Sequence, residues 1–189
     1  MKKNLLAALL VSGLSVAAIA PQTAHAVDGT INITGTITAN TCAIGGASPS
    51  STTVVLPTVQ TSALTGGAAK VAGSTPFSLA ATGCPVATGH TLTAYFEPGV
   101  NIDTATHNLV STGTASGVQV QLLNGSGSTA TAFSPILLGN ASSAQNSGAF
   151  TVSSTGTATM SYYAQYYASL ATVSAGTVIS AATFTLIYN

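Results

Sequence analysis

Apolar and polar residues alternate along much of this chain with a period of two, the spacing of a β-strand with one buried face. The clearest run is Val27–Thr38, in which odd positions are apolar or glycine and even positions are polar. A second run lies at the C-terminal end of the given sequence. Its even positions are apolar, with Ser180 as the exception. The apolar positions of that run are Val178, Ala182, Phe184, Leu186 and Tyr188.

Short runs of this kind follow one another, bounded by Gly, Pro, Asn or Ser, and almost no segment has helical periodicity. We therefore predict a single all-β domain, a sandwich or barrel with the sandwich favoured. The expected strands are Thr30–Thr38, Thr53–Leu56, Pro76–Thr82, Thr91–Phe96, Asn108–Ser111, Gly117–Leu123, Ala132–Leu138, Ala149–Val152, Thr157–Ala168 and Thr177–Tyr188.

The strand Gly117–Leu123 makes the most detailed prediction. Its even positions are apolar, whereas Gln119 and Gln121 are polar, so we expect one buried face and one wet face. Asn124-Gly125 follows directly and favours a tight turn. The chain is therefore predicted to fold back onto Ala132–Leu138.

The first residues indicate the compartment. Lys2 and Lys3 precede an apolar stretch, and Ala24-His25-Ala26 has small residues at the cleavage positions of a secretory signal. We predict a cleaved signal peptide over residues 1–26 and export to the periplasm. The alternative, a transmembrane helix, is disfavoured because the stretch is shorter than the ~20 residues that span a bilayer. No later segment is long enough, so no membrane insertion is expected.

Charge is nearly absent from residues 27–189, whose only charged side chains are Lys70, Asp28, Glu97 and Asp103. A nucleic-acid partner is excluded, because phosphate neutralisation needs clustered Lys and Arg and the chain has no Arg. Disorder is disfavoured as well, since 46% of the residues are hydrophobic. The abundance of Ser, Thr, Gly and β-branched residues suits strands and turns.

Cys42 and Cys84 are the only cysteines, and in an exported protein an even pair indicates a disulfide. The alternative of a redox or metal-binding pair lacks a C-x-x-C spacing, and only His90 and His107 could add imidazole ligands. The few carboxylates are scattered, so no catalytic pair or triad is indicated. We expect no enzyme activity, no metal and no cofactor.

Four features in order carry a resemblance to a known family. The alternating segment Gly29–Ile37 leads through Asn40-Thr41 to Cys42, and Pro76-Phe77-Ser78-Leu79 leads to Cys84-Pro85. Gly117–Leu123 resembles the central strand of the family. At the far end, Tyr188 is penultimate and Gly176 is the fourteenth residue from the C-terminus. Across its mature length the sequence resembles the major subunits of type 1 fimbriae, the chaperone-usher pilins.

The resemblance implies an incomplete immunoglobulin-like β-sandwich over residues 39–189, completed by a donor strand from a neighbouring subunit. The donor would be the N-terminal extension 27–38. Its inserted side would comprise Ile31, Ile33, Gly35 and Ile37. The strand that faces the groove and the chaperone would contain Gly176, Val178, Phe184, Leu186 and Tyr188.

The family further implies other pilin subunits, a periplasmic chaperone and an outer-membrane usher as partners, in a homopolymer that supports cell adhesion at the cell surface. An alternative within the same fold is a minor adapter or tip pilin with a carbohydrate- or receptor-binding role. The tyrosine pairs at 162–163 and 166–167 could line a sugar-binding face, although core and surface positions of a strand explain them more simply. The first segment could also be the edge strand of a complete sandwich.

Overall fold

The computed structural model describes residues 42–45, 51–86 and 89–189, which all lie in one compact unit, Thr38–Asn189. This part of the chain is almost entirely strand and connecting segment, with two short 3-10 helices. The elements in chain order are β1 (Ala43–Ile44), η1 (Thr61–Ala63), β2 (Val71–Thr82), β3 (Thr91–Phe96), β4 (Ile102–Asp103), β5 (Asn108–Val110), β6 (Val118–Asn124), η2 (Ser142–Ala144), β7 (Phe150–Thr151), β8 (Ala158–Ala168) and β9 (Phe184–Tyr188).

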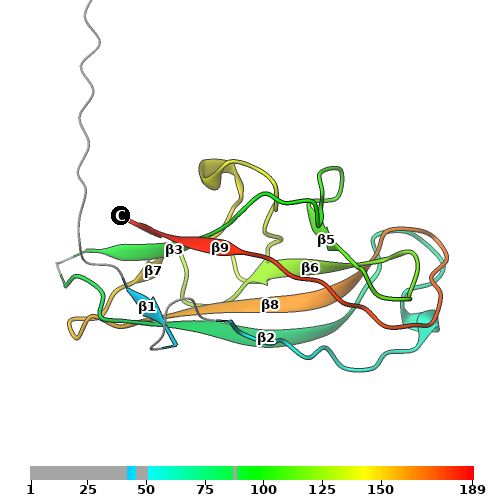
Figure 1. The fold of residues 1–189 in the computed structure, drawn as a ribbon, viewed down its shortest axis with the longest axis horizontal. Coiled ribbons are helices and arrows are strands. Elements are labelled where there is room, and N and C mark those ends of the chain that lie inside the picture. The colour runs from blue at the N-terminus through cyan, green and yellow to red at the C-terminus, as the bar shows by residue number, and fades with distance from the viewer. Residues whose placement is uncertain (1–41, 46–50, 87–88) are drawn as a thin grey trace, which may run out of the picture. The chain divides into compact units, whose positions relative to one another are not determined.

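The strands form two sheets in which all pairs are antiparallel (Figure 1). The larger sheet has the order β1-β2-β8-β6-β5-β4, and the smaller has the order β7-β3-β9. The long strands β2 and β8 pair over most of their length, with a bulge between Ala72 and Thr75. The predicted all-β class is confirmed, and the arrangement is a two-sheet sandwich of the immunoglobulin-like kind.

The core lies between the sheets and is centred on the aromatic ring of Tyr162, which is fully buried. The rings of Phe77, Phe96 and Phe150 lie with their centroids 5.6, 5.8 and 5.6 Å from it. Such tilted and edge-on contacts are the favoured packing of aromatic rings. Burial raises the pKa of Tyr162 to about 12. This tyrosine therefore serves the core.

Six of the predicted strands match the observed elements closely, whereas others need correction. Ala132–Leu138 is not a strand, because Phe133 has a φ of 62° and only Pro135 forms a bridge, to Leu123. Thr53–Leu56 contains no assigned strand, and the long C-terminal run is regular only over β9. The predicted strand Thr30–Thr38 lies outside the described residues.

The expected wet face of the strand Gly117–Leu123 is also wrong. Gln119 is buried there, and its amide donates a hydrogen bond of 2.7 Å to the carboxylate of Asp103. Its carbonyl oxygen accepts a bond of 2.7 Å from Thr106. Gln119 lies on the polar side of the alternation, as the pattern indicated. Asp103 at the end of β4 and Thr106 in the following turn supply the polar partners that allow its side chain to be buried.

Candidate functional site: an open groove beside the last strand

The strand β9 pairs with β3 along one edge only. Thr91 and Asn189 exchange two backbone hydrogen bonds of 2.9 and 3.1 Å, and Glu97 donates one of 2.9 Å to Thr183. In an antiparallel ladder the backbone groups of alternate residues point to opposite sides. The N–H and C=O groups of Phe184, Leu186 and Tyr188 therefore point away from β3, and no backbone partner for them exists among the described residues.

An apolar groove of about 1110 Å³ lies beside this unpaired edge. Its floor consists of core side chains from both sheets, namely Leu79, Phe96, Leu109, Val120, Leu122 and Ala164. One wall is formed by alternate residues of β9, and the other by Val54 and Leu56. We call this feature the open groove. Among the described residues, no charged side chain lines its walls or floor.

The wall opposite β9 is the segment 51–56. Val54 and Leu56 are half-buried and pack against the core, whereas Val55 between them is 78% exposed. The segment thus has the alternation of a strand, although no strand is assigned to it. Unsatisfied strand edges readily accept another strand. The free edge of β9 lies on the other side, so the groove has unpaired backbone along one wall and an alternating apolar segment along the other.

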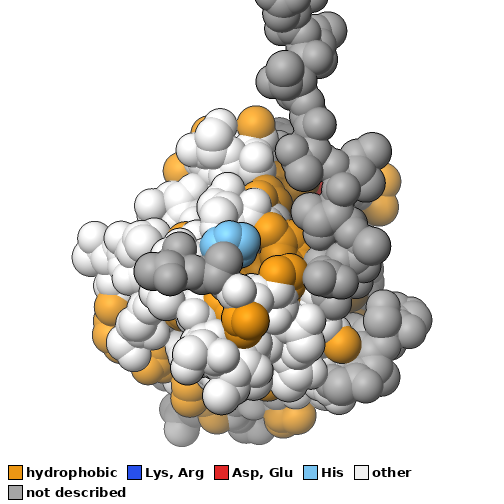
Figure 2. All heavy atoms as spheres, turned by 90° about the vertical axis from the view of Figure 1, so that its left-hand side faces the viewer, with side chains coloured by type: hydrophobic (Ala, Val, Ile, Leu, Met, Phe, Trp, Pro, Cys, Tyr) orange, Lys and Arg blue, Asp and Glu red, His pale blue; other side chains and the backbone are white. Residues whose placement is uncertain are grey.

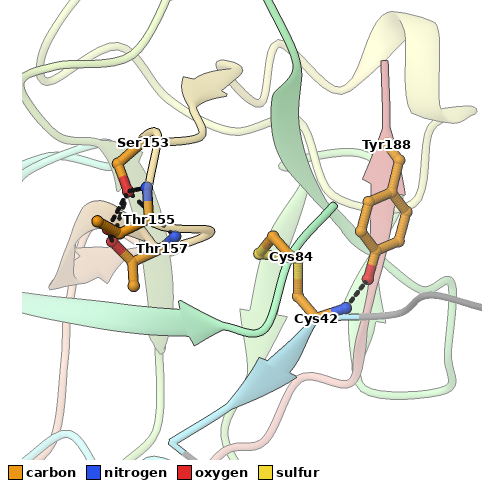
Figure 3. Close-up of a disulfide and its surroundings, with 6 residues drawn as sticks. All are labelled: Cys42, Cys84, Ser153, Thr155, Thr157 and Tyr188. Carbon is orange, nitrogen blue, oxygen red and sulfur yellow. Dashed lines mark hydrogen bonds between the residues drawn. A yellow bond between two sulfur atoms is a disulfide. The ribbon is translucent and has the colours of Figure 1, made fainter. Parts of the chain in front are cut away.

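One end of the open groove is held by the disulfide between Cys42 and Cys84 (Figure 3), which confirms the predicted bridge. The hydroxyl of Tyr188 accepts a hydrogen bond of 2.6 Å from the backbone N–H of Cys42. Cys84 in turn donates its N–H to the carbonyl of Gly156 at 2.9 Å. The end of β9 is therefore connected to the start of β1 and, through the disulfide, to the end of β2.

The other end is held by a second device, formed by residues 110–116 and 174–180, which we call the hydroxyl clip. Two backbone bonds link Thr112 to Ile179 and Ala115 to Thr177, at 2.8 and 3.0 Å. Side-chain hydroxyls supply most of the others. Each of Thr114 and Thr177 donates its N–H to the hydroxyl of the other, and Ser116 pairs with Ser174 in the same region.

Two glycines allow the segments of the hydroxyl clip to approach closely. A Cβ atom at Gly113 would lie 2.6 Å from the carbonyl carbon of Thr177, and one at Gly176 would lie 2.7 Å from that of Thr114. Real Cβ atoms do not approach backbone so closely, so any side chain would force the segments apart. Gly176, predicted from the family pattern, thus has a packing role in this structure.

Figure 2 shows the end of the molecule that carries β1 and the C-terminus. Hydrophobic side chains gather near the middle of this face, and no Lys or Arg of the described residues is visible on it. The described carboxylate with a shifted pKa is Asp103, whose pKa is lowered by the backbone N–H of Ala105, then by the amide of Gln119 and the N–H of Thr106. Asp103 does not line the open groove.

The structure brings together several of the residues singled out from the sequence. Val178, Phe184, Leu186 and Tyr188 all line the open groove, and Gly176 lies in the hydroxyl clip beside it. The donor positions Ile31, Ile33, Gly35 and Ile37 lie outside the described residues. Sequence reasoning missed the opposite wall: the apolar-polar alternation at 53–56 was visible, but nothing in it indicated a groove.

Within residues 42–45, 51–86 and 89–189, no cluster of three or more His, Cys, Asp or Glu side chains could hold a metal ion. In the same part of the chain, no helix has the length and apolar character needed to cross a bilayer.

Comparison with known proteins gives a consistent result. A family model described as type-1 fimbrial protein, A (FimA) matches residues 56–189. The major fimbrial subunit SMF-1 of Stenotrophomonas maltophilia (strain K279a) is 41% identical over 177 residues, covering 91% of this chain and 99% of that one. The F17 fimbrial protein of Escherichia coli is 38% identical over 178 residues, covering 92% and 94%.

A solved structure supports the fold. The crystal structure of the P pilus rod subunit PapA superimposes with a TM-score of 0.53 at 15% identity, covering 85% of this chain and 99% of that one. Together with the family match, the two-sheet sandwich and its open groove define a β-sandwich of the pilin class. The chain belongs to the type-1 fimbrial protein family, and it is a structural subunit of a fimbria on the cell surface.

Proposed function

We propose that this chain is the repeating shaft subunit of its fimbria, and that each copy fills the open groove of a neighbour with its own residues 27–38. The observation that carries the proposal is the unpaired edge of β9. Phe184, Leu186 and Tyr188 present both free backbone groups and apolar side chains along the groove. A strand added there would complete the ladder and cover the core at once.

The extension 27–38 has the composition that such a groove requires. Ile31, Ile33 and Ile37 share one parity, and the polar residues between them would face solvent. Burying three side chains of this size contributes roughly 5 to 9 kcal/mol before the cost of ordering the segment. Gly35, on the same parity, would allow the donor backbone to approach a narrow part of the groove.

The same edge supports a role for helper proteins before assembly. A free subunit would expose the backbone of β9 and an apolar groove to other copies, which favours aggregation. We infer that a periplasmic chaperone covers the groove first and that an outer-membrane usher exchanges it for the next subunit. The name of the 41%-identical relative, a major fimbrial subunit, supports the shaft role over that of a scarce adapter.

The proposal is tested by two neighbouring substitutions in the extension. Gly35→Arg places a large charged side chain on the inserted parity, whereas Thr36→Arg adds the same side chain on the other. We expect Gly35→Arg to abolish surface fibres in electron micrographs and Thr36→Arg to leave them. Normal fibres from Gly35→Arg would contradict the donor assignment.

A mixing experiment separates a failed donor from a failed fold. The Gly35→Arg subunit keeps an intact groove, so it can accept a strand from another copy but cannot donate its own. Co-expressed with the wild type, it should therefore occupy only one end of a chain and shorten the fibres in proportion to its share. An unfolded variant would instead be absent from the fibres, and the length of the remaining fibres would not change.

A further inference from the structure

The outer face of the larger sheet carries a small cluster that faces away from the groove and the core. Along β8, Tyr162 points into the core, so Ser161 and Tyr163 point to the opposite face. The register of β2 places Ser78 opposite Ser161 and Pro76 opposite Tyr163. A half-buried aromatic ring is therefore surrounded by hydroxyl groups on a solvent-facing part of the sheet.

A hollow of about 280 Å³ lies beside the ring of Tyr163, with the serines at 78, 126 and 161 among its lining residues. Ser126 reaches it because Gly125 lies against β8. The N–H of Gly125 donates to the carbonyl of Ser161 at 2.9 Å, and a Cβ atom there would be 2.5 Å from the carbonyl carbon.

A second ring, that of Phe133, extends the aromatic surface. Its centroid is 4.7 Å from that of Tyr163, the planes are inclined by 37°, and the residue is 59% exposed. Phe133 also has a φ of 62°, which a bulky side chain rarely adopts. Its N–H donates to the carbonyl of Asn124 at 2.7 Å, which helps to hold this conformation. The residue thus combines an uncommon backbone conformation with a ring that is exposed to solvent.

Charge restricts what such a hollow could bind. Lys70, Glu97 and Asp103 are the charged side chains of the described residues, and none of them lines the hollow. On the same face of the sheet, the amide of Gln165 donates to that of Gln121 at 2.9 Å, so one amide retains donors and the other an acceptor. The surface thus offers aromatic rings and neutral groups that both donate and accept hydrogen bonds.

We propose that this hollow, lined by Ser78, Ser126, Ser161 and Tyr163 and extended by the neighbouring ring of Phe133, binds a neutral saccharide. The apolar face of a pyranose ring packs against Tyr163 and Phe133, and its hydroxyls exchange hydrogen bonds with the serines. A sugar hydroxyl is both donor and acceptor, as a serine hydroxyl is. A second pilin is a less suitable occupant of this face. A stable contact between proteins buries a larger apolar area than one pair of aromatic rings provides.

The inference rests on the proposed polymer in one respect. A shallow, solvent-open site binds a single sugar weakly, but a fibre that repeats it on every subunit binds a polysaccharide with much higher avidity. The relevant material is therefore the intact fibre. Whether the chain polymerises is visible in micrographs, so a failure of the polymer and a failure of the sugar site are separate observations.

The test measures binding of purified wild-type fibres to immobilised maltohexaose, cellohexaose, mannohexaose and chitohexaose. We expect at least one to bind, with little change between low and high salt because no charge takes part. Phe133→Asn removes the ring at a position whose positive φ suits Asn, and should weaken binding at least about tenfold. Leu170→Asn, at a site 58% exposed, is the matched control and should bind as the wild type.

A second variant, Ser161→Ala, removes one hydroxyl of the hollow. It should weaken binding of the fibres to the same hexaose without changing the shape of the fibres. The proposal is overturned if none of the four sugars binds wild-type fibres, or if Phe133→Asn binds as tightly as the wild type. It is also overturned if Phe133→Asn changes only the diameter or coiling of the fibres, because the face would then be a contact between subunits.

Discussion

The two ends of the open groove are closed by different means. At the end of β9, a disulfide and the hydroxyl of Tyr188 connect three segments around Cys42. At the other end, the hydroxyl clip joins residues 110–116 and 174–180 by hydrogen bonds and close glycine packing, with no covalent link. Between them the edge of β9 has no partner among the described residues. The open groove is thus fixed at both ends, by a covalent link at one and by hydrogen bonds at the other.

Removal of the covalent end should produce the largest effect. In the double variant Cys42→Ser/Cys84→Ser, the unfolded chain regains the freedom of a long loop, and the chain-entropy model gives a loss of about 4 kcal/mol. The measurement is the free energy of unfolding in urea of the purified mature chain, residues 27–189. A loss below about 1 kcal/mol would show that Tyr188 and the strand β1 hold this end without the disulfide.

The hydroxyl clip should be the end of the groove that is more easily loosened. Two glycines without positive φ, Gly113 and Gly99, provide a test substitution and its matched control. In Gly113→Ala the new methyl group meets the backbone of Thr177, whereas at Gly99 nothing lies within 4 Å. Gly113→Ala should destabilise the subunit by roughly 1–3 kcal/mol, as overpacking does, and Gly99→Ala should have little effect.

Amide exchange distinguishes local from global loosening in the Gly113→Ala variant. The amide of Ala115, which bonds Thr177 across the hydroxyl clip, should exchange faster. The amide of Cys84, at the disulfide end, should keep the protection of the wild type. Equal acceleration at both amides would mean that the two ends form one cooperative unit and would contradict the comparison.

Much of the fold could be predicted because a strand with one buried face is recognisable from the alternation of its own neighbouring residues. The strand β3 was placed correctly from alternation alone, and Phe184, Leu186 and Tyr188, which alternation put on one face, all line the open groove. The disulfide followed from there being only two cysteines in an exported chain. In each case neighbouring residues, together with the compartment, were sufficient.

The remaining features depend on contacts between distant segments. Burial of Gln119 requires Asp103 and Thr106, and the hydroxyl clip requires that Thr114 meet Thr177. Ser and Thr in a loop normally indicate only a turn, so nothing in 110–116 indicated a partner. Phe133 was assigned to a strand because its neighbours are apolar, and its positive φ depends on the packing around β6.

The smallest expected effect is the response of the clip end to acid. Asp103 ends β4, just before the turn into β5, the strand that leads into the hydroxyl clip, and hydrogen bonds to its carboxylate lower its pKa from the ordinary value in the folded state. A lowered pKa contributes stability that is fully present above the pKa of the unfolded chain and is lost as the pH falls through the folded value. Asp103→Asn should therefore be less stable than the wild type at about pH 6, and the difference should shrink towards about pH 2.5. Urea unfolding at both pH values measures this, and a constant difference would show that the charge of Asp103 contributes nothing. Because Asp103 lies on the side of the hydroxyl clip, acid should speed exchange at the amide of Ala115 before that of Cys84.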